Sequence, residues 1–319
     1  MTKPLVAVVV GPTASGKTAL AVEIAKAFDG EVVSADSMQI YKGMDIATAK
    51  PTEEEMQGIP HHLISIIGAD EVFSVNQFKL SATKAINDIL EKGKLPVVAG
   101  GTGFYIDTLV NNTEFLDYEE NDIREKLEKR LESEGIAVLH KELSDIDPET
   151  AERLHLNDEK RIIRALEVYY STGKTISEQC RLSHLKESDF RFCIIGINAL
   201  DRQVLYDRIN LRVDKMLEEG LLKEAKNFFG SEVSATAKQA IGYKELKPYF
   251  DGLCTLDEAV EKLKMETRRY AKRQLTWFRK RENINWIYID GKTKDEIINE
   301  AKSIILSNKL AQMKGKGND

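Results

Sequence analysis

Short apolar runs recur along the chain and alternate with longer segments that have helical spacing. Runs of this kind are typical of strands buried on both faces of a parallel sheet. They predict strands over Leu5–Val10, Glu31–Ala35, Leu95–Gly101, Phe190–Ile197 and Ile284–Ile289. Helical spacing predicts helices over Ala19–Phe28, Ser74–Leu90, Leu200–Glu219 and Leu256–Glu282, with a final helix that ends near Ser307. The alternation predicts an α/β fold built on a parallel sheet.

The pattern changes near Phe115. Beyond this residue the chain is rich in charged side chains, keeps a helical period and lacks strand signals. Four short helices are expected there, over Asn121–Glu134, Ile136–Leu143, Pro148–His155 and Asp158–Ser171. We therefore predict a helical insertion domain, residues 116–189, within an α/β core formed by residues 1–115 and 190–319.

Composition narrows the class of protein. The chain has 319 residues, 42% of them hydrophobic, which is enough for a sizeable core. Its net charge of −6 excludes a generally basic surface, so any RNA site must be a local patch. The three cysteines, Cys180, Cys193 and Cys254, are far apart and fit a reduced compartment. The first apolar run is too short to span a membrane. We expect a cytoplasmic monomer without membrane contact.

A glycine-rich loop follows the first apolar run. Its residues are Gly11, Pro12, Thr13, Ala14, Ser15, Gly16, Lys17 and Thr18. They match the phosphate-binding pattern Gly-x-x-x-x-Gly-Lys-[Ser/Thr], in the expected place between a strand and a helix. Glycines let backbone N–H groups wrap a phosphate, and the helix N-terminus favours an anion. Lys17 supplies a charge, and the Thr18 hydroxyl can hold Mg²⁺. The loop does not identify the phosphate compound.

The ends of the next two strands carry further candidates, because ligands of open parallel sheets bind beyond the carboxyl ends of strands. Asp36 follows the second strand and either faces the phosphate loop or caps a turn. The third strand ends in Gly100-Gly101-Thr102, where an ATPase would usually place an aspartate to hold the metal. Small residues suit the close approach of a ligand, and Thr102 is either a turn residue or a contact for it.

Basic side chains occur at three places. Arg208 and Arg212 lie four residues apart on a predicted helix, where they could clamp a diphosphate or pair with nearby aspartates. Lys160, Arg161 and Arg164 form either a solvated charged face or a binding surface. Between Lys262 and Arg281 there are nine Lys or Arg residues and one acidic residue, Glu266. This stripe favours a polyanion site, because ordinary solvated surfaces mix signs.

Taken together, these motifs resemble the bacterial tRNA dimethylallyltransferases. In chain order they are GPTASGKT, ADSMQIYKGMDIATAKP, GGTGFY, NDEKRIIRALEVY, AIGYKE and TRRYAKRQLTWFR. The resemblance runs from about residue 5 to residue 290, and the second block is far more specific than the phosphate loop. It implies a P-loop NTPase-like core. It also implies transfer of a dimethylallyl group from dimethylallyl diphosphate to N6 of the adenine 3′-adjacent to the anticodon, with Mg²⁺ as cofactor.

The resemblance also implies roles for residues at the site. The phosphate loop and Arg212 would hold the diphosphate leaving group, so the loop would not bind ATP for hydrolysis. Asp36 would accept the proton of the amine or orient it, and Thr102 would lie by the leaving group. Asp36, Thr102 and Lys17 would then be the catalytic residues.

Contacts with the tRNA anticodon stem-loop are implied for a larger set. These residues are Asp36, Ser37, Met38, Gln39, Thr102, Arg124, Lys160, Arg161, Ile162, Ile163, Arg164, Ala240, Ile241, Gly242, Tyr243, Lys244 and Glu245. Ser37 to Gln39 would contact the flipped base. The chain departs from some members at position 160, where it has Lys and they have Gln.

Other classes of protein share parts of this pattern. A small-molecule kinase would use the same phosphate loop, but the third-strand ending and the basic stripe fit it poorly. An RNA-binding module without catalysis would not need Asp36 and Thr102 to converge on the loop. An enzyme that prenylates free AMP would need neither the long insertion nor the basic helix.

Overall fold

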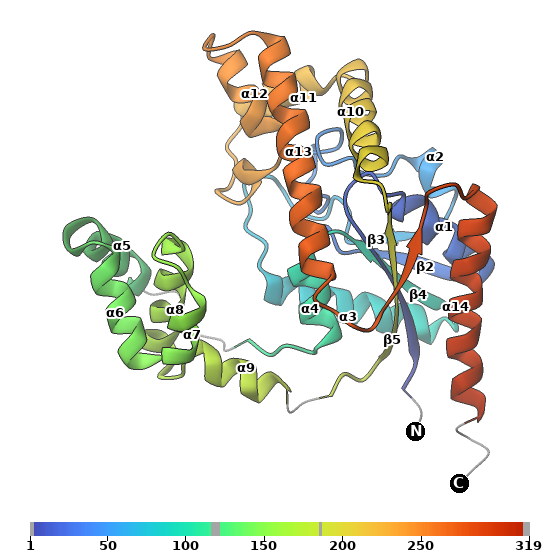
Figure 1. The fold of residues 1–319 in the computed structure, drawn as a ribbon, viewed down its shortest axis with the longest axis horizontal. Helices are drawn as coiled ribbons and strands as arrows, with labels where there is room; N and C mark the ends of the chain where they lie inside the picture. Colours follow the sequence, from blue (N-terminus) through green and yellow to red (C-terminus); the bar gives the residue numbers. More distant parts are fainter. Residues whose placement is uncertain (1–2, 116–121, 185–186, 315–319) are drawn as a thin grey trace. The chain divides into compact units, whose positions relative to one another are not determined.

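The computed structural model describes residues 3–115, 122–184 and 187–314 (Figure 1). The chain forms two compact units. Unit 1 comprises Met1–Leu109 and Asp189–Asp319, and unit 2 comprises Val110–Ser188. Unit 2 therefore begins at Val110, whereas the insertion was predicted to begin at residue 116, where the composition changes.

Unit 1 is built on a six-stranded parallel sheet with the strand order β3-β2-β4-β1-β5-β6. The strands are β1 (Leu5–Val10), β2 (Gly30–Ser34), β3 (His61–His62), β4 (Leu95–Gly100), β5 (Arg191–Asn198) and β6 (Ile284–Tyr288). This confirms the predicted α/β class and the five predicted strands. The short edge strand β3 was not predicted, because two histidines carry no strand signal.

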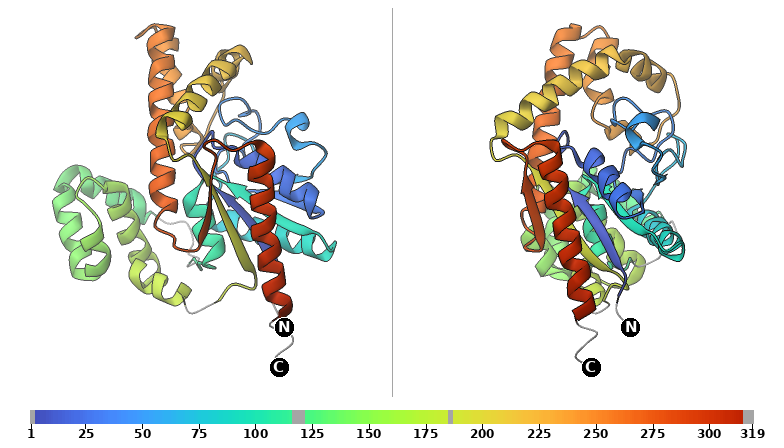
Figure 2. Two further views of the ribbon diagram at one scale, coloured as in Figure 1. Left: turned by 45° about the vertical axis from the view of Figure 1, so that its right-hand side comes forward. Right: turned by 90° about the vertical axis from the view of Figure 1, so that its right-hand side faces the viewer.

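Helices cover both faces of this sheet (Figure 2). The helices of unit 1 are α1 (Lys17–Ala27), α2 (Glu53–Met56), α3 (Val75–Glu91), α4 (Gly103–Val110), α10 (Arg202–Glu218), α11 (Leu221–Phe229), α12 (Tyr243–Phe250), α13 (Leu256–Phe278) and α14 (Lys294–Lys314), with a 3₁₀ turn, η1 (Ala237–Gln239). Ser74 caps α3 by accepting a hydrogen bond from the N–H of Gln77. Helix α3 contacts β2 and β4, whereas α14 contacts β5, β6 and α1.

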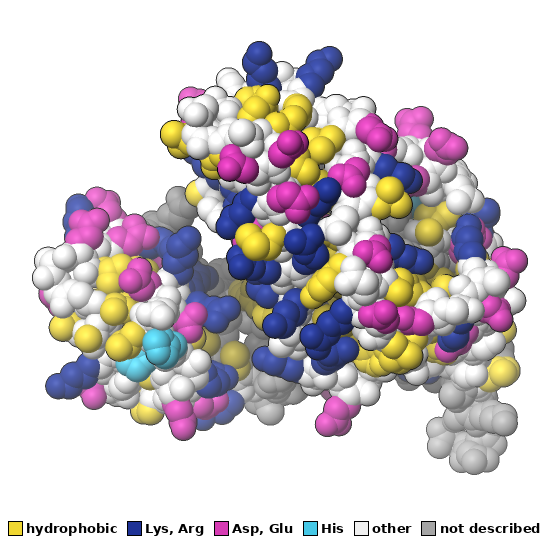
Figure 3. Space-filling view, turned by 45° about the horizontal axis from the view of Figure 1, so that its top comes forward, with side chains coloured by type: hydrophobic (Ala, Val, Ile, Leu, Met, Phe, Trp, Pro, Cys, Tyr) yellow, Lys and Arg dark blue, Asp and Glu magenta, His cyan; other side chains and the backbone are white. Residues whose placement is uncertain are grey.

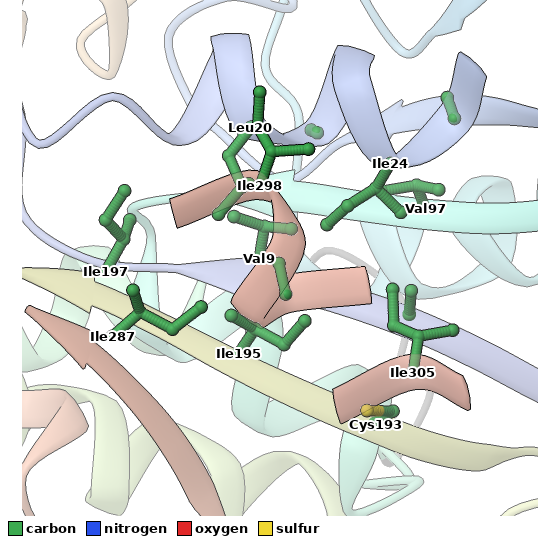
Figure 4. Packing of buried hydrophobic residues seen from close by; sticks show 14 of the residues in the cluster. Val9, Leu20, Ile24, Val97, Cys193, Ile195, Ile197, Ile287, Ile298 and Ile305 are labelled. Atoms are coloured by element: carbon green, nitrogen blue, oxygen red, sulfur yellow. The ribbon is translucent and has the colours of Figure 1, made fainter. Parts of the chain in front are cut away.

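The core of unit 1 follows from the alternation of side chains along each strand, because successive side chains point to opposite faces of the sheet. On one face, Val9, Val97 and Ile195 pack with Ile24 of α1 and Ile298 of α14 (Figure 4). The alternate strand residues point to the opposite face and are also buried, as expected for a sheet covered on both sides. This rigid sheet holds the carboxyl ends of β1, β2 and β4 side by side.

Unit 2 is a small helical bundle. Its helices are α5 (Ile123–Glu134), α6 (Ile136–Ile146), α7 (Pro148–Arg153), α8 (Glu159–Thr172) and α9 (Ile176–His184). The four predicted helices are present, and α9 was not predicted. Their apolar faces form a core of their own around Leu139, Leu143, Ile162 and Leu166. No helix in the described parts of either unit is long and apolar enough to cross a membrane.

Candidate active site

A cavity of about 320 Å³ lies within unit 1, beyond the carboxyl ends of β1, β2 and β4. We call it the reaction cavity. It is lined by Thr13, Lys17, Thr18, Asp36, Ser37, Met38, Gln39, Ala47, Thr48, Ala49, Ala99, Gly100, Ile209, Arg212, Val213, Met216, Gln239, Ala240, Ile241, Gly242, Lys244, Leu263, Thr267, Tyr270, Arg273 and Gln274. Among these described residues Asp36 is the only acidic one, against four basic side chains. The cavity therefore suits an anion.

The phosphate loop forms one end of this cavity. A Cβ atom on Gly11 would lie 2.3 Å from the carbonyl oxygen of Ile197, so glycine is required there. Ala14 and Gly16 have positive φ values of 63° and 99°. The N–H of Ser15 donates to the carbonyl oxygen of Pro12 at 3.3 Å, which closes the turn. Successive backbone N–H groups in such turns form a concave anion site at the start of α1.

Two cationic side chains, Lys17 and Arg212, lie at the phosphate loop and form no ion pair with a carboxylate among the described residues. The Lys17 ammonium donates to the carbonyl oxygen of Pro12 at 2.7 Å. Burial, with a smaller contribution from the positive charge of Arg212, lowers the pKa of Lys17 to about 7, although Asp36 opposes the shift. Arg212 donates from Nη1 to Thr13 Oγ1 at 3.1 Å, and burial lowers its pKa as well. An anion bound between them would favour the charged form of both.

Asp36 and Thr102 come together because β2 and β4 are neighbouring strands. Asp36 Oδ1 accepts a hydrogen bond from the N–H of Met38 at 2.9 Å. The N–H of Ser37 donates to Thr102 Oγ1 at 3.0 Å, and the Thr102 hydroxyl donates to Ser37 Oγ at 3.3 Å. Asp36 lines the reaction cavity, but Thr102 is not among its described lining residues. Thr102 therefore holds the turn that presents Asp36.

Gln274 links the phosphate loop to the end of β4. Its Oε1 accepts from the N–H of Thr13 at 2.8 Å, and its Nε2 donates to the carbonyl oxygen of Gly101 at 3.0 Å. A Cβ atom on Gly101 would lie 2.1 Å from that Nε2, so glycine makes room for the amide. Sequence reasoning missed Gln274, because no local pattern marks a contact between residues 261 positions apart.

Glu224 on α11 holds the loop that forms one wall of the cavity. Its carboxylate accepts hydrogen bonds from the N–H groups of Asp45, Ile46 and Ala47, at 2.9, 2.8 and 2.9 Å. The Tyr243 hydroxyl donates to the same carboxylate at 2.8 Å. Three consecutive N–H groups on one half-buried carboxylate fix the loop backbone strongly. Sequence reasoning missed Glu224 as well.

The predicted segment Ala240–Glu245 lies against this loop and lines the cavity through Ala240, Ile241, Gly242 and Lys244, whereas Tyr243 and Glu245 are buried and not among its described lining residues. Gly242 has a φ of +116°, and a Cβ atom there would lie 2.8 Å from the Cβ of Ala47. Only glycine therefore fits at position 242, where the segment packs against Ala47. Glu245 is buried and accepts from the N–H of Gly242 at 2.9 Å, whereas Lys244 is exposed at the cavity. Gln39, from the other predicted set, donates to the carbonyl oxygen of Ala49 at 3.2 Å.

The basic residues of the predicted stripe between Lys262 and Arg281 do not share one site in the structure. Arg273 lines the reaction cavity beside Tyr270, whereas Lys272 and Arg279 line a different cavity. Lys264 pairs with Asp214 at 2.8 Å. Figure 3 shows a group of Lys and Arg side chains on this face of unit 1. The stripe is thus several groups of cations with different surroundings, because a helix turns 100° per residue.

The predicted arginine pair on α10 does not act as a clamp. Arg212 lines the reaction cavity, but Arg208 is exposed and lies near Asp290 instead. Spacing of four residues places both on one side of the helix, but the cavity lies only beside Arg212. The diphosphate interpretation therefore stays a prediction for Arg212 alone.

The residues predicted on the insertion lie in unit 2. Ile162 and Ile163 are buried in its core, so their side chains pack inside the bundle. Lys160 and Arg161 are exposed at the start of α8, and Arg161 pairs with Asp158 at 3.4 Å. Arg124 pairs with Glu128 and Glu167, and Arg164 pairs with Glu167.

No preformed metal cluster exists in the described residues, since no group of three or more His, Cys, Asp or Glu side chains meets there. His61 and His62 point to separate partners, the carbonyl oxygen of Ile59 and the carboxylate of Glu31. At the reaction cavity, Asp36 is the only carboxylate among the described lining residues, and Thr18 carries the hydroxyl that phosphate-loop proteins use for Mg²⁺. Mg²⁺ typically takes one or two protein oxygens together with phosphate oxygens, so these residues fit a metal that arrives with its phosphate ligand.

Comparison with known proteins identifies the family. A family model described as IPP transferase matches residues 39–281. The tRNA dimethylallyltransferase of Acetivibrio thermocellus is 54% identical over 296 residues, which cover 92% of this chain and 94% of that protein. The tRNA dimethylallyltransferase of Bacillus cereus is 46% identical and covers 95% of this chain and 96% of its own length.

Solved structures agree with the sequence matches. The full-length tRNA isopentenylpyrophosphate transferase of Bacillus halodurans superposes with a TM-score of 0.74 at 44% identity, covering 99% of both chains. A eukaryotic dimethylallyltransferase acting on tRNA gives a TM-score of 0.82 at 32% identity, covering 97% of this chain and 79% of that one. Both the sequence and the fold match over nearly the whole chain, and the chain therefore belongs to the IPP transferase family.

Proposed function

We propose that this chain transfers the dimethylallyl group of dimethylallyl diphosphate to N6 of the adenine 3′-adjacent to the anticodon of tRNAs, with release of diphosphate. One observation carries the proposal. The reaction cavity brings together the phosphate loop, Arg212, a single carboxylate among its described lining residues, Asp36, and several apolar side chains. The names of the relatives, tRNA dimethylallyltransferase, support the same substrate pair.

The leaving group is the first task of the site. An allylic carbon–oxygen bond breaks readily once the charge that develops on the diphosphate is neutralised. The N–H groups of the loop, Lys17 and Arg212 supply that neutralisation. Ile209, Val213 and Leu263 supply an apolar wall for the five-carbon group.

Acceptance of the amine is the second task. As the bond between carbon and the diphosphate oxygen breaks, a bond forms from that carbon to the adenine nitrogen. One proton of the amine passes to the Asp36 carboxylate, while the diphosphate leaves with the electrons of the broken bond. Thr102 keeps the turn at Ser37 in place and so orients Asp36. Tyr270 and Met38 line the same cavity and give the flipped base a surface to pack against.

The adenine must leave the stacked anticodon loop to reach Asp36. We propose that Ser37, Met38 and Gln39 contact this base, and that exposed Lys244 at the cavity meets backbone phosphates. Arg124, Lys160, Arg161 and Arg164 on unit 2 would contact the anticodon stem-loop. The buried side chains of Ile162 and Ile163 would support these contacts from inside the bundle.

Thr18 and the diphosphate oxygens would hold Mg²⁺, which would supply further charge neutralisation to the leaving group. The complete reaction cavity lies within unit 1 of one chain, so we propose that a monomer is sufficient for it. We place the reaction in the cytoplasm, where tRNAs are modified.

A small-molecule kinase is the main alternative, because it would share the phosphate loop. The end of β4 argues against it: the residues there are Gly100 and Gly101, and Gly101 makes room for the Gln274 amide. A carboxylate that holds a catalytic metal is usual at this point in phosphate-loop ATPases.

One assay tests the proposal. Purified protein with Mg²⁺ receives labelled dimethylallyl diphosphate or labelled ATP, and tRNA, AMP or ATP as acceptor in turn. We expect label from dimethylallyl diphosphate on one adenine of tRNA, equimolar release of diphosphate, and unchanged ATP. Phosphoryl transfer from ATP, or prenylation of AMP in preference to tRNA, would reject the proposal.

A further inference from the structure

A second, smaller cavity of about 70 Å³ lies where β5 ends, between α10 and α13. Its lining consists of Asn198, Ala199, Arg202, Leu205, Tyr206, Ala271, Lys272, Leu275, Thr276 and Arg279. Three of these side chains are basic, and none of them is acidic. We call it the β5-end cavity.

Helix α13 lies between the two cavities and turns one side to each. The reaction cavity takes Leu263, Thr267, Tyr270, Arg273 and Gln274, and the β5-end cavity takes Ala271, Lys272, Leu275, Thr276 and Arg279. At 100° per residue these two sets fall on opposite sides of the helix. The wall between the cavities is a small apolar cluster of Leu205, Ile209 and Ala271, against which Ala14 packs. The β5-end cavity is therefore separate from the reaction cavity.

None of the three cations forms an ion pair within the described part of the chain. Arg202, Lys272 and Arg279 are exposed, and no carboxylate in the described residues lies within ion-pair distance of them. The two acidic side chains next to the start of α10 are engaged elsewhere. Asp201 accepts from the N–H of Gln203 at 2.8 Å, and Asp290 accepts from the N–H groups of Leu200 and Asp201. Three like charges around one cavity repel one another until an anion lies between them.

Asn198 adds a second, independent observation. It is 2% exposed, and its Oδ1 has no hydrogen-bond partner among the described residues. A buried acceptor without a partner is unfavourable, so this oxygen requires a donor. An anion that also carries an O–H group meets both needs. Hydrogen phosphate has such a group at neutral pH, whereas sulfate and the phosphate diesters of RNA do not.

We propose that the β5-end cavity binds a phosphate-class oxyanion, with anionic oxygens on Arg202, Lys272 and Arg279 and an O–H donated to Asn198. The unpartnered oxygen of Asn198 favours free phosphate over a backbone phosphate of RNA as the source. The proposal does not depend on prenyl transfer, because its readout is binding.

Calorimetric titration with inorganic phosphate tests the proposal. The full chain carries Lys17→Met, so that the phosphate loop contributes little to the heat. The cavity variant adds Arg202→Gln, Lys272→Gln and Arg279→Gln. A matched control adds Arg208→Gln, Lys215→Gln and Lys280→Gln, which remove the same charge from exposed positions outside the cavity. Sulfate is titrated in parallel, and tRNA affinity is measured for both triple variants at one salt concentration.

We expect phosphate to bind with a dissociation constant on the order of 1 mM, at least about tenfold more tightly than sulfate. This binding should persist in the control and disappear in the cavity variant. If free phosphate gives no heat but only the cavity variant loses at least about tenfold in tRNA affinity, the oxyanion is a backbone phosphate, which overturns both free phosphate as the source and the O–H contact with Asn198. Equal binding of sulfate would overturn the role of Asn198. Absence of phosphate binding together with equal tRNA affinity in the two triple variants would overturn the site.

Discussion

Lys17 and Arg212 in the reaction cavity are proposed to meet phosphate, as are Arg124 and Arg161 on unit 2, yet their surroundings differ. In the described part of the chain, the first two have no carboxylate partner, and burial lowers the pKa of each. The last two are exposed and paired with acidic side chains. The two cavity cations therefore have no ion pair to break when the proposed diphosphate binds. The two arginines of unit 2 would instead exchange a carboxylate for an RNA phosphate. Substitutions should therefore have large effects in the cavity and small ones on unit 2.

Asp36 should show the largest effect. Asp36→Asn keeps the size of the side chain but removes the proton acceptor, so kcat should fall by about 10²–10⁴. Affinity for tRNA, measured by filter binding, should change less than about threefold. Loss of tRNA affinity with an unchanged single-turnover rate would instead assign Asp36 to binding.

Substitution of Lys17 should have the second-largest effect on turnover. Lys17→Met removes a charge that the leaving diphosphate needs, and turnover should fall by about 10²–10³. The same change should raise the melting temperature of the free protein, because it removes a buried, repelled ammonium. This gain should be largest below pH 7, where Lys17 is charged in the folded state. Lys26→Met, on the exposed side of α1, serves as the control and should change neither quantity.

Glu224 tests whether the loop that forms the cavity wall needs this carboxylate to hold it in place. Glu224→Gln replaces an anion that accepts three loop N–H groups and one hydroxyl, and kcat/KM should fall about 10- to 100-fold. Glu218→Gln, an exposed change nearby, should have no effect. Circular dichroism checks that the helices remain folded. A normal kcat/KM in Glu224→Gln would show that the loop keeps its place without this anion.

The pKa of Lys17 also predicts a pH dependence of diphosphate binding. The free protein holds Lys17 charged below about pH 7 and neutral above it, whereas the bound anion favours the charged form. Affinity for dimethylallyl diphosphate should therefore fall by up to about tenfold per pH unit as the pH rises above 7. Calorimetry between pH 6 and 9 measures this, with proton uptake on binding near pH 8. A profile of the same slope in Lys17→Met would assign the effect to another group.

Unit 2 should give the smallest effect, and in the opposite direction. Glu167 accepts from Arg124 at 3.3 Å and from Arg164 at 3.2 Å. Glu167→Gln removes this competing anion, so tRNA should bind about two- to fivefold more tightly, with a steeper salt dependence. Weaker binding would mean that Glu167 orients the two arginines for the RNA.

Local patterns in the sequence predict most of the fold, because strand burial and helix period are local properties. The phosphate loop and the convergence of Asp36 and Thr102 follow from a motif and from parallel strand order. The anchors Glu224 and Gln274 could not be predicted, since each reaches the loop it holds across more than 170 residues of sequence. Helical spacing also grouped Arg208 with Arg212, and the charge count placed Lys272 and Arg273 in one stripe, although a cavity accepts only part of a helix face.

The two ends of unit 2 meet each other. Asn112 Nδ2 donates to the carbonyl oxygen of Glu187 at 3.4 Å, and Gln179 Nε2 donates to the carbonyl oxygen of Glu114 at 2.9 Å. A segment whose ends lie together can be gained, lost or exchanged as a cassette without shifting the strands on either side of it. The order β4 then β5 would survive such an exchange. With unit 2 contacting the RNA as proposed, evolution could therefore vary how the RNA is read while the chemistry of the sheet edge stays unchanged.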